Sequence, residues 1–122
     1  MSLTFVEMPW FTERLRRRLD AETYRAFQNE LLANPDKGDV MPGCGGLRKV
    51  RCADPSRGRG KRGGIRIIYL YIPTARRIDL FDVYGKDEKD DLSPSEKKLL
   101  ATLVEMVRAE ATAAYWRKRG AR

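Results

Sequence analysis

Two strand-like runs that flank a glycine-rich basic loop constrain the fold of this chain more than any other stretch. The runs are residues 47–53 and 64–72, and the second is rich in β-branched and aromatic side chains. Because consecutive strands usually pair, the two runs predict an antiparallel hairpin around the loop. The other predicted elements have to pack around this hairpin.

The excess positive charge of the chain is concentrated in the same hairpin. Between Arg48 and Arg66 there are eight basic residues and one acid, a net charge of +7, whereas the whole chain carries +8. Clustered cations beside glycine, where a partner can approach the backbone closely, suit a polyphosphate. A solubilising surface loop is the alternative, but the charge density and the flanking strands favour nucleic acid. The basic residues are Arg48, Lys49, Arg51, Arg57, Arg59, Lys61, Arg62 and Arg66.

The length and composition predict one folded domain spanning residues 1–122. Hydrophobic residues make up 42% of the chain, enough for a core. There is no histidine, and Cys44 and Cys52 are too few ligands for a zinc site. Cys52 alternates with Val50 and is predicted to be a small buried residue. No apolar run is long enough to cross a membrane and no signal peptide is evident, so a cytoplasmic protein without a membrane partner is expected.

Local signals predict two N-terminal helices, two strands in addition to the hairpin and a long C-terminal helix. A proline in the first turn, an aspartate N-cap, an asparagine before proline and a serine–glutamate capping box mark the helix ends. The arginines of the first helix are interpreted as a solvated face. We expect an α+β domain whose helices pack on one side of an antiparallel sheet, with about 111–122 as a helical extension and basic tail. The predicted elements are a strand at 4–8, helices at 9–19 and 20–34, strands at 47–53, 65–72 and 77–86, and a helix from Ser93.

The expected strand register brings several polar side chains to one end of the sheet. A turn centred near Ala75 places Arg66 opposite Tyr84. A basic loop centred near Arg57 to Arg59 places Arg51 opposite Arg66. A slip of one residue in either turn would move these side chains to the other face. Lys86 is two residues from Tyr84 and shares its face. The predicted cluster is Arg51, Arg66, Tyr84 and Lys86, beside the loop that bears Lys61 and Arg62.

The tyrosine, lysines and arginines of this cluster suit one reaction, the cleavage of RNA by its own 2′-hydroxyl. Without histidine there is neither a serine triad nor a histidine-based ribonuclease pair, and no P-loop motif is present. RNA carries its own nucleophile, the 2′-hydroxyl, so an enzyme needs to align it, neutralise the phosphate and protonate the departing 5′-oxygen. Arginine can neutralise phosphate through a bidentate fork. Tyrosine and lysine can transfer protons, although their ordinary pKa values of about 10 make the reaction depend on substrate alignment by a large partner.

Five blocks, in chain order, resemble the RelE/HigB-type toxins of bacterial type II toxin–antitoxin systems, within the RelE/ParE superfamily. The Lys-Arg-Gly-Gly block with its following strand is the most specific part. The resemblance spans roughly residues 4–110, nearly the whole domain. The blocks that carry it are 34–40 (NPDKGDV), 43–51 (GCGGLRKVR), 58–69 (GRGKRGGIRIIY), 83–86 (VYGK) and 91–94 (DLSP).

The resemblance implies a fold, an activity and partners. It implies a RelE/ParE-like antiparallel sheet with two N-terminal helices and a C-terminal helix, and cutting of mRNA in the ribosomal A site without a cofactor. It also implies a cognate antitoxin with a helix-turn-helix DNA-binding domain. By motif matching, the catalytic residues are Arg66, Tyr84 and Lys86, and the RNA-binding residues are Lys49, Arg51, Lys61 and Arg62.

Some positions depart from the family pattern, and two other functions stay open. Cys44 stands where threonine is common, the loop at 54–56 is long, the final helix is extended, and Asp82 places an acid on the strand face of Tyr84. The first alternative is a non-catalytic RNA- or ribosome-binding module in which Tyr84 only packs. The second is a ParE-like toxin directed at gyrase, because a fold does not fix a function.

Overall fold

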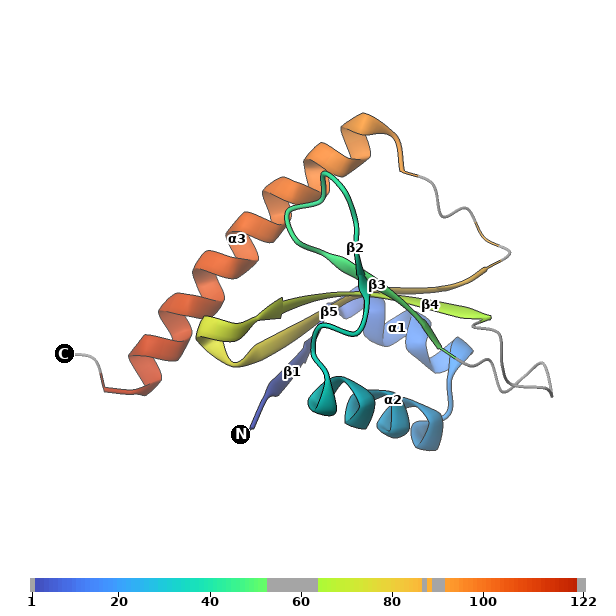
Figure 1. Ribbon diagram of the computed structural model, residues 1–122, viewed down its shortest axis with the longest axis horizontal. Helices are drawn as coiled ribbons and strands as arrows, with labels where there is room; N and C mark the ends of the chain where they lie inside the picture. Colours follow the sequence, from blue (N-terminus) through green and yellow to red (C-terminus); the bar gives the residue numbers. More distant parts are fainter. Residues whose placement is uncertain (1, 53–63, 87, 89–91, 121–122) are drawn as a thin grey trace.

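A five-stranded sheet with the order β1-β5-β4-β3-β2 forms the centre of the computed structural model (Figure 1). The structure describes residues 2–52, 64–86, 88 and 92–120. β4 and β5 are the longest strands and lie in the middle of the sheet, joined by a short 3-10 turn, η2 (Pro73–Ala75). The strands are β1 (Thr4–Glu7), β2 (Asp39–Val40), β3 (Arg48–Cys52), β4 (Ile65–Ile72) and β5 (Arg77–Gly85).

The three helices begin where the sequence signals predict. They are α1 (Pro9–Arg18), α2 (Ala21–Ala33) and α3 (Pro94–Lys118). The Asp20 carboxylate accepts a hydrogen bond from the Thr23 backbone N–H at 2.7 Å, which caps α2. Ser93 and Glu96 form the reciprocal capping box that starts α3. Among the described residues, no helix combines the length and the apolar character needed to cross a membrane.

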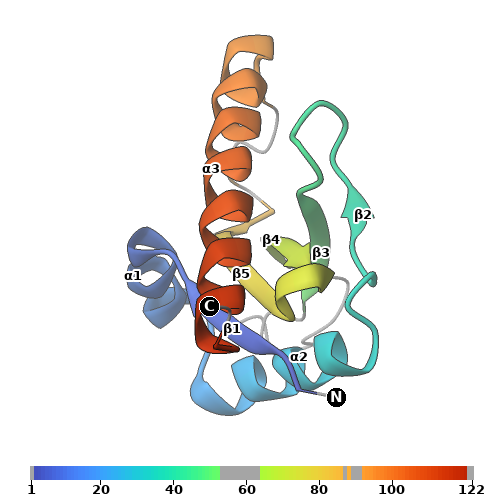
Figure 2. The same cartoon turned by 90° about the vertical axis from the view of Figure 1, so that its left-hand side faces the viewer.

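The helices lie on both faces of the sheet, so the prediction that they share one side is wrong (Figure 2). β4 is apolar at almost every position, and its alternate side chains feed two separate cores. The α1/α2-side core contains Phe11, Leu19, Phe27, Leu31, Val50, Ile65, Ile67, Tyr69, Ile78, Leu80 and Val83. The α3-side core contains Met41, Cys44, Leu47, Ile68, Leu70, Ile72, Ala75, Phe81, Tyr84, Val104 and Ala111.

The α+β class is confirmed, but the sheet is mixed where an antiparallel one was expected. β1 pairs with β5 in parallel, with Thr4 opposite Arg77. The connection from β1 to β5 is long enough for this, because it includes α1, α2 and the three strands β2 to β4, whereas a tight turn can join only antiparallel neighbours. β2, which lies in a predicted loop, pairs with β3 at the other edge. Cys44 is fully buried, whereas Cys52 is only partly buried against the α1/α2-side core, and the two cysteines do not form a disulfide with each other.

An ion-pair network fixes α3 to β5. Asp79 of β5 is buried, and the Arg77 guanidinium binds its carboxylate at 2.7 Å and the Glu110 carboxylate of α3 at 2.8 Å. The hydrogen bond to Asp79 is the main cause that raises the pKa of Arg77, and the hydrogen bond from Arg77 lowers the pKa of Glu110. Because Asp79 is buried, losing Arg77 would leave a desolvated charge without its partner.

Tyr69 holds the turn that leads into β2. Its ring is fully buried, its hydroxyl donates to the Pro35 carbonyl at 2.7 Å, and the same hydroxyl accepts from the Gly38 N–H at 2.9 Å. Burial raises the pKa of this phenol, so the hydroxyl stays protonated and can donate. The turn carries Lys37, which lines one of the cavities described below.

Replacing Tyr69 with phenylalanine should lower the free energy of unfolding by about 1–3 kcal/mol, because the buried Gly38 N–H loses its acceptor. Tyr71→Phe is the matched control. Tyr71 lies on the same strand, and its hydroxyl makes no hydrogen bond to any described residue, so the change should stay within about 0.5 kcal/mol. Denaturant unfolding of both variants measures the difference. Equal effects of the two substitutions would contradict the role given to Tyr69.

Candidate functional site

A one-residue register shift in the β4–β5 ladder decides which side chains meet. The shift lies just beyond Ile68 and makes Phe81 the extra residue of β5. Continuing the pairing that starts at the η2 turn would place Val83 opposite Arg66. The bulge brings Tyr84 to that position instead. It therefore also sets the face of β5 on which Tyr84 lies.

Three of the predicted site residues form a row across adjacent strands. Arg51 of β3 lies opposite Arg66 of β4, and Arg66 lies opposite Tyr84 of β5. Both predicted pairs are confirmed. Lys49 is two residues from Arg51 and therefore shares its face, the one that faces α3. The row thus runs across the α3 side of the sheet, at the end away from the η2 turn.

A cleft of about 710 Å³ next to this row collects positive charge. We call it the cationic cleft. Its walls come from β2, β3, β4, the loop after β2 and the first turn of α3. Among its described lining residues, Asp39 is the single acid, and it lies opposite Lys49 in the β2–β3 ladder. The cations that line it are Lys37, Lys49, Arg51, Arg66 and Lys97.

Sequence reasoning missed Lys37 and Lys97 as members of this cleft. Lys37 lies in the asparagine–proline block that carries the family resemblance, so a signal was present. Lys97 lies in the first turn of α3, and no local pattern distinguishes it from a solvated lysine. The predicted RNA-binding residues Lys61 and Arg62 lie outside the described residues.

A second cavity, of about 410 Å³, lies between α1 and the end of β5, and we call it the α1 pocket. Tyr84 lines this pocket and not the cationic cleft, although it is next to Arg66 in the sheet. The two cavities share Met41 and Leu92 and therefore adjoin each other. Tyr84 is only 8% exposed and belongs to the α3-side core.

The third predicted catalytic residue stands apart from both cavities. Lys86 is exposed and is not among the described residues that line either the cationic cleft or the α1 pocket. Its backbone N–H donates to the Gly64 carbonyl at 2.9 Å, which extends the β4–β5 pairing by one step. The structure therefore brings Arg66 and Tyr84 to neighbouring strands and places Lys86 just beyond the end of β5.

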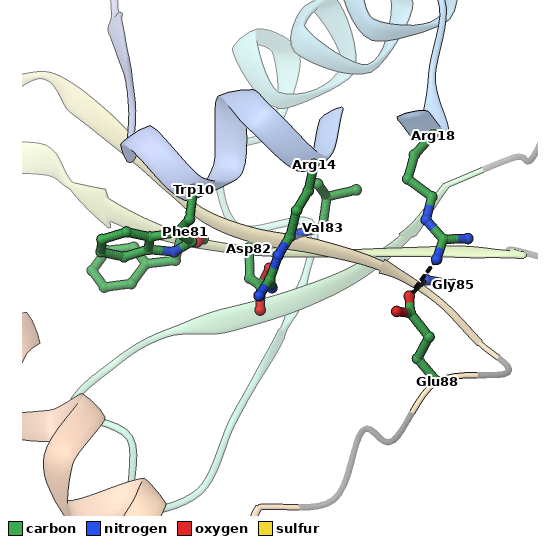
Figure 3. Close-up of polar contacts among 8 residues, drawn as sticks. All are labelled: Trp10, Arg14, Arg18, Phe81, Asp82, Val83, Gly85 and Glu88. Atoms are coloured by element: carbon green, nitrogen blue, oxygen red, sulfur yellow. Dashed lines mark hydrogen bonds and ion pairs between the residues drawn. The ribbon is translucent and has the colours of Figure 1, made fainter. Parts of the chain in front are cut away.

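Helix α1 is tied to this end of β5 by contacts that the sequence did not predict (Figure 3). The Arg14 guanidinium binds the Asp82 carboxylate at 2.5 Å, and Arg18 binds Glu88 at 2.5 Å. The Trp10 indole N–H donates to the Phe81 carbonyl at 2.6 Å. The interpretation of the α1 arginines as a purely solvated face is therefore wrong for Arg14 and Arg18. Partners almost 70 positions away leave no local sequence signal.

The ion pairs from α1 balance the negative charges of the two acids near Tyr84, Asp82 and Glu88. The Asp82 carboxylate accepts from the Val83 N–H at 2.8 Å as well as from Arg14. Glu88 accepts from the Gly85 N–H at 2.7 Å as well as from Arg18. Asp82, the acid on the strand face of Tyr84 that departs from the family pattern, thus has its charge balanced by Arg14 of α1. Among the described residues, no three side chains of the usual metal-binding types come together.

Comparisons with known proteins agree with this architecture. No protein-family model matches the sequence. A mutant of the E. coli toxin RelE in the free state aligns over 85% of this chain and 98% of its own, with a TM-score of 0.52 and 17% identity. The RelE–RelB complex of Pyrococcus horikoshii also matches, with a TM-score of 0.48 and 21% identity over 73% of this chain and 100% of its own. The isolated E. coli RelE toxin matches with a TM-score of 0.48 and 18% identity over 87% of this chain and 99% of its own. At these identities the likeness concerns the fold, and the chain has the α+β fold of a RelE-type toxin.

Proposed function

We propose that this protein is the toxin of a type II toxin–antitoxin pair, and that it blocks translation by cutting mRNA in the ribosomal A site. The observation that carries the proposal is the row of Arg51, Arg66 and Tyr84 beside a cleft lined by five cations. The solved structure of similar fold is described as a toxin, which supports the same role here. The proposed place of action is the cytoplasm, where ribosomes and mRNA are found.

The proposed reaction is transfer of the scissile phosphate to the neighbouring 2′-hydroxyl. The 2′-oxygen attacks phosphorus, the bond to the 5′-oxygen breaks, and a 2′,3′-cyclic phosphate and a 5′-hydroxyl result. Arg66 neutralises the phosphate charge as it develops. Tyr84 and Lys86 divide the two proton transfers, one removing the 2′-hydroxyl proton and the other protonating the 5′-oxygen. No metal or organic cofactor takes part in the proposed reaction.

The remaining cations serve to hold the RNA backbone in the proposed complex. Lys49 and Arg51 face the cationic cleft, and the family resemblance adds Lys61 and Arg62. Since Tyr84 is largely buried, productive contact with RNA requires that the substrate be fixed closely against the sheet. The ribosome supplies that alignment in the proposal, because it holds the A-site codon in a defined position.

The proposed partner that controls the activity is a cognate antitoxin with a helix-turn-helix DNA-binding domain. The excess charge of +8 on this chain favours an acidic segment laid across the cationic cleft. Such a segment would compete directly with the RNA backbone for the same side chains.

A second candidate function is a non-catalytic RNA- or ribosome-binding module. The burial of Tyr84, at 8% exposure within the α3-side core, favours it. In this case the cationic cleft binds phosphates as before, and Tyr84 contributes only packing. The two candidates differ in whether new RNA ends appear.

The first prediction is that binding to RNA or ribosomes weakens steeply with salt and that Arg51 contributes to the slope. Arg51→Ala should make the plot of log binding constant against log salt concentration less steep by about 0.7. The reason is that the variant neutralises one phosphate fewer, so binding releases fewer counterions. Arg25→Ala on α2 is the matched control, since it removes another exposed arginine that does not line the cleft and should leave the slope unchanged. Equal slopes for wild type and Arg51→Ala would exclude this residue from the contact.

The second prediction concerns cleavage, read by mapping 5′ ends of cellular mRNA after brief expression. Arg66→Ala should abolish cleavage, and Arg66→Lys should rescue it only in part because an ammonium cannot form the fork. Tyr84→Phe should slow cleavage by about 10²- to 10⁴-fold, and Lys86→Ala should slow the chemistry more than it weakens binding.

Thermal melts of the same variants are the folding control. If all of them melt like wild type and still cut at full rate, the assignment of Arg66, Tyr84 and Lys86 is wrong. Growth arrest without new RNA ends would instead select the non-catalytic module.

The third prediction is that a neighbouring gene encodes the antitoxin. Co-expression of that open reading frame should restore growth and yield a complex that co-purifies with this protein. An acidic segment of the partner should protect the cationic cleft, which a Lys49→Glu substitution would test by weakening the complex. Failure of every adjacent open reading frame to rescue growth would argue against the toxin proposal.

A further inference from the structure

The α1 pocket differs in chemistry from the cationic cleft that it adjoins. Three arginines and two acids are among its described lining residues, against five cations and one acid in the cleft. Two of the three arginines are the ones bound by Asp82 and Glu88. The phosphate of a nucleic acid is therefore drawn to the cleft, and the α1 pocket suits a group without charge.

Apart from these charged side chains, the walls of the α1 pocket are aromatic and apolar. Trp10, Phe81 and Tyr84 line it together with Ile68, Leu92 and Leu100. Trp10 is 44% exposed, and its indole N–H is held by the Phe81 carbonyl at 2.6 Å (Figure 3). This bond fixes the ring beside the opening while leaving part of the indole uncovered. A partly exposed aromatic ring next to a positively charged groove is the combination that binds single-stranded nucleic acid.

The two cavities are placed so that one nucleotide can reach both. Arg66 lines the cleft, its cross-strand neighbour Tyr84 lines the α1 pocket, and adjacent strands lie about 4.8 Å apart. Met41 and Leu92 form a boundary common to the two cavities. The third arginine, Arg17, also lines the pocket, and its ion pair among the described residues is with exposed Glu13 at 3.5 Å.

We propose that the α1 pocket binds one unstacked nucleobase of the RNA strand whose phosphate lies in the cationic cleft. The inference rests on the proposed function for the identity of the strand, and it adds a base subsite formed by α1. A protein side chain could also enter an apolar pocket. The continuity with the cleft, and the presence of Arg17 with only an exposed acid as its ion-pair partner among the described residues, favour a polyanion that places an uncharged base in the pocket.

The test measures binding to ribosomes programmed with an mRNA whose A-site codon carries 2′-O-methyl groups, which remove the nucleophile. One mRNA keeps its three A-site bases, and the other has abasic nucleotides there with the same phosphates. Wild type should bind the complex that has bases about tenfold to a hundredfold more tightly, the range expected for stacking of a base on an aromatic side chain.

Substitutions at Trp10 separate stacking from structural support. Trp10→Leu should abolish the preference for bases, whereas Trp10→Phe, which also loses the indole hydrogen bond but keeps a ring, should retain much of it. Trp116→Leu removes an exposed ring from α3 and should leave the preference unchanged. Leu100→Phe narrows the pocket from α3 without altering α1, so it tests the pocket even if Trp10→Leu fails to fold.

The outcomes distinguish this inference from the proposed function. Equal binding of both mRNAs by wild type, or a preference that survives in both Trp10→Leu and Leu100→Phe, would overturn the base subsite and leave the pocket to a protein partner. Ribosome binding and cleavage would persist in that case. Absence of binding to either programmed ribosome would overturn the proposed function, and the base subsite with it.

Discussion

The pairing of β4 with β5, including its one-residue bulge, is the constraint on which the functional face depends. β4 is apolar on both sides and supplies both cores, so its position in the sheet cannot change without exposing one of them. The bulge at Phe81 then sets the face of every later residue of β5. A ladder without it would turn Tyr84 toward the α1/α2 side and leave Arg66 without its aromatic neighbour. The geometry of the candidate site is thus fixed by the same contacts that fix the fold.

Helix α1 holds the second half of β5 in place. β1 pairs with the first half of β5 only, and beyond it the Trp10 indole bonds to the strand at Phe81. The arginines of α1 then reach the acids at the end of the strand. Exposed ion pairs contribute little to stability, so these ties matter more for charge than for folding. They pair two of the three arginines of the α1 pocket with acids, beside a cleft that keeps its positive charge.

Most element boundaries could be predicted, because their signals are local. The Asp20 cap, the Ser93–Glu96 capping box and the proline positions each act within one helical turn. The pairing of Arg51, Arg66 and Tyr84 was predicted from turn positions alone, although the η2 turn by itself implies a different partner for Arg66. The prediction is right because the bulge compensates for that difference, and the bulge has no sequence signal of its own.

The features that could not be predicted are those that depend on long-range packing. Nothing local indicates that β1 runs parallel to β5, that α3 covers the opposite face from α1 and α2, or that Arg14 and Arg18 have partners on β5. The burial of Tyr84 has the same origin, since it comes from segments that meet only in the folded chain.

The burial of Tyr84 also limits how the proposed chemistry can work. A hydroxyl in a largely buried side chain can transfer a proton only to a group that enters the wall where it lies. Tyr84 lines the α1 pocket, whereas Arg66 lines the cleft. A substrate that occupied the cleft alone would meet the arginine and miss the tyrosine. Catalysis by both residues therefore requires a nucleotide that spans the boundary at Met41 and Leu92.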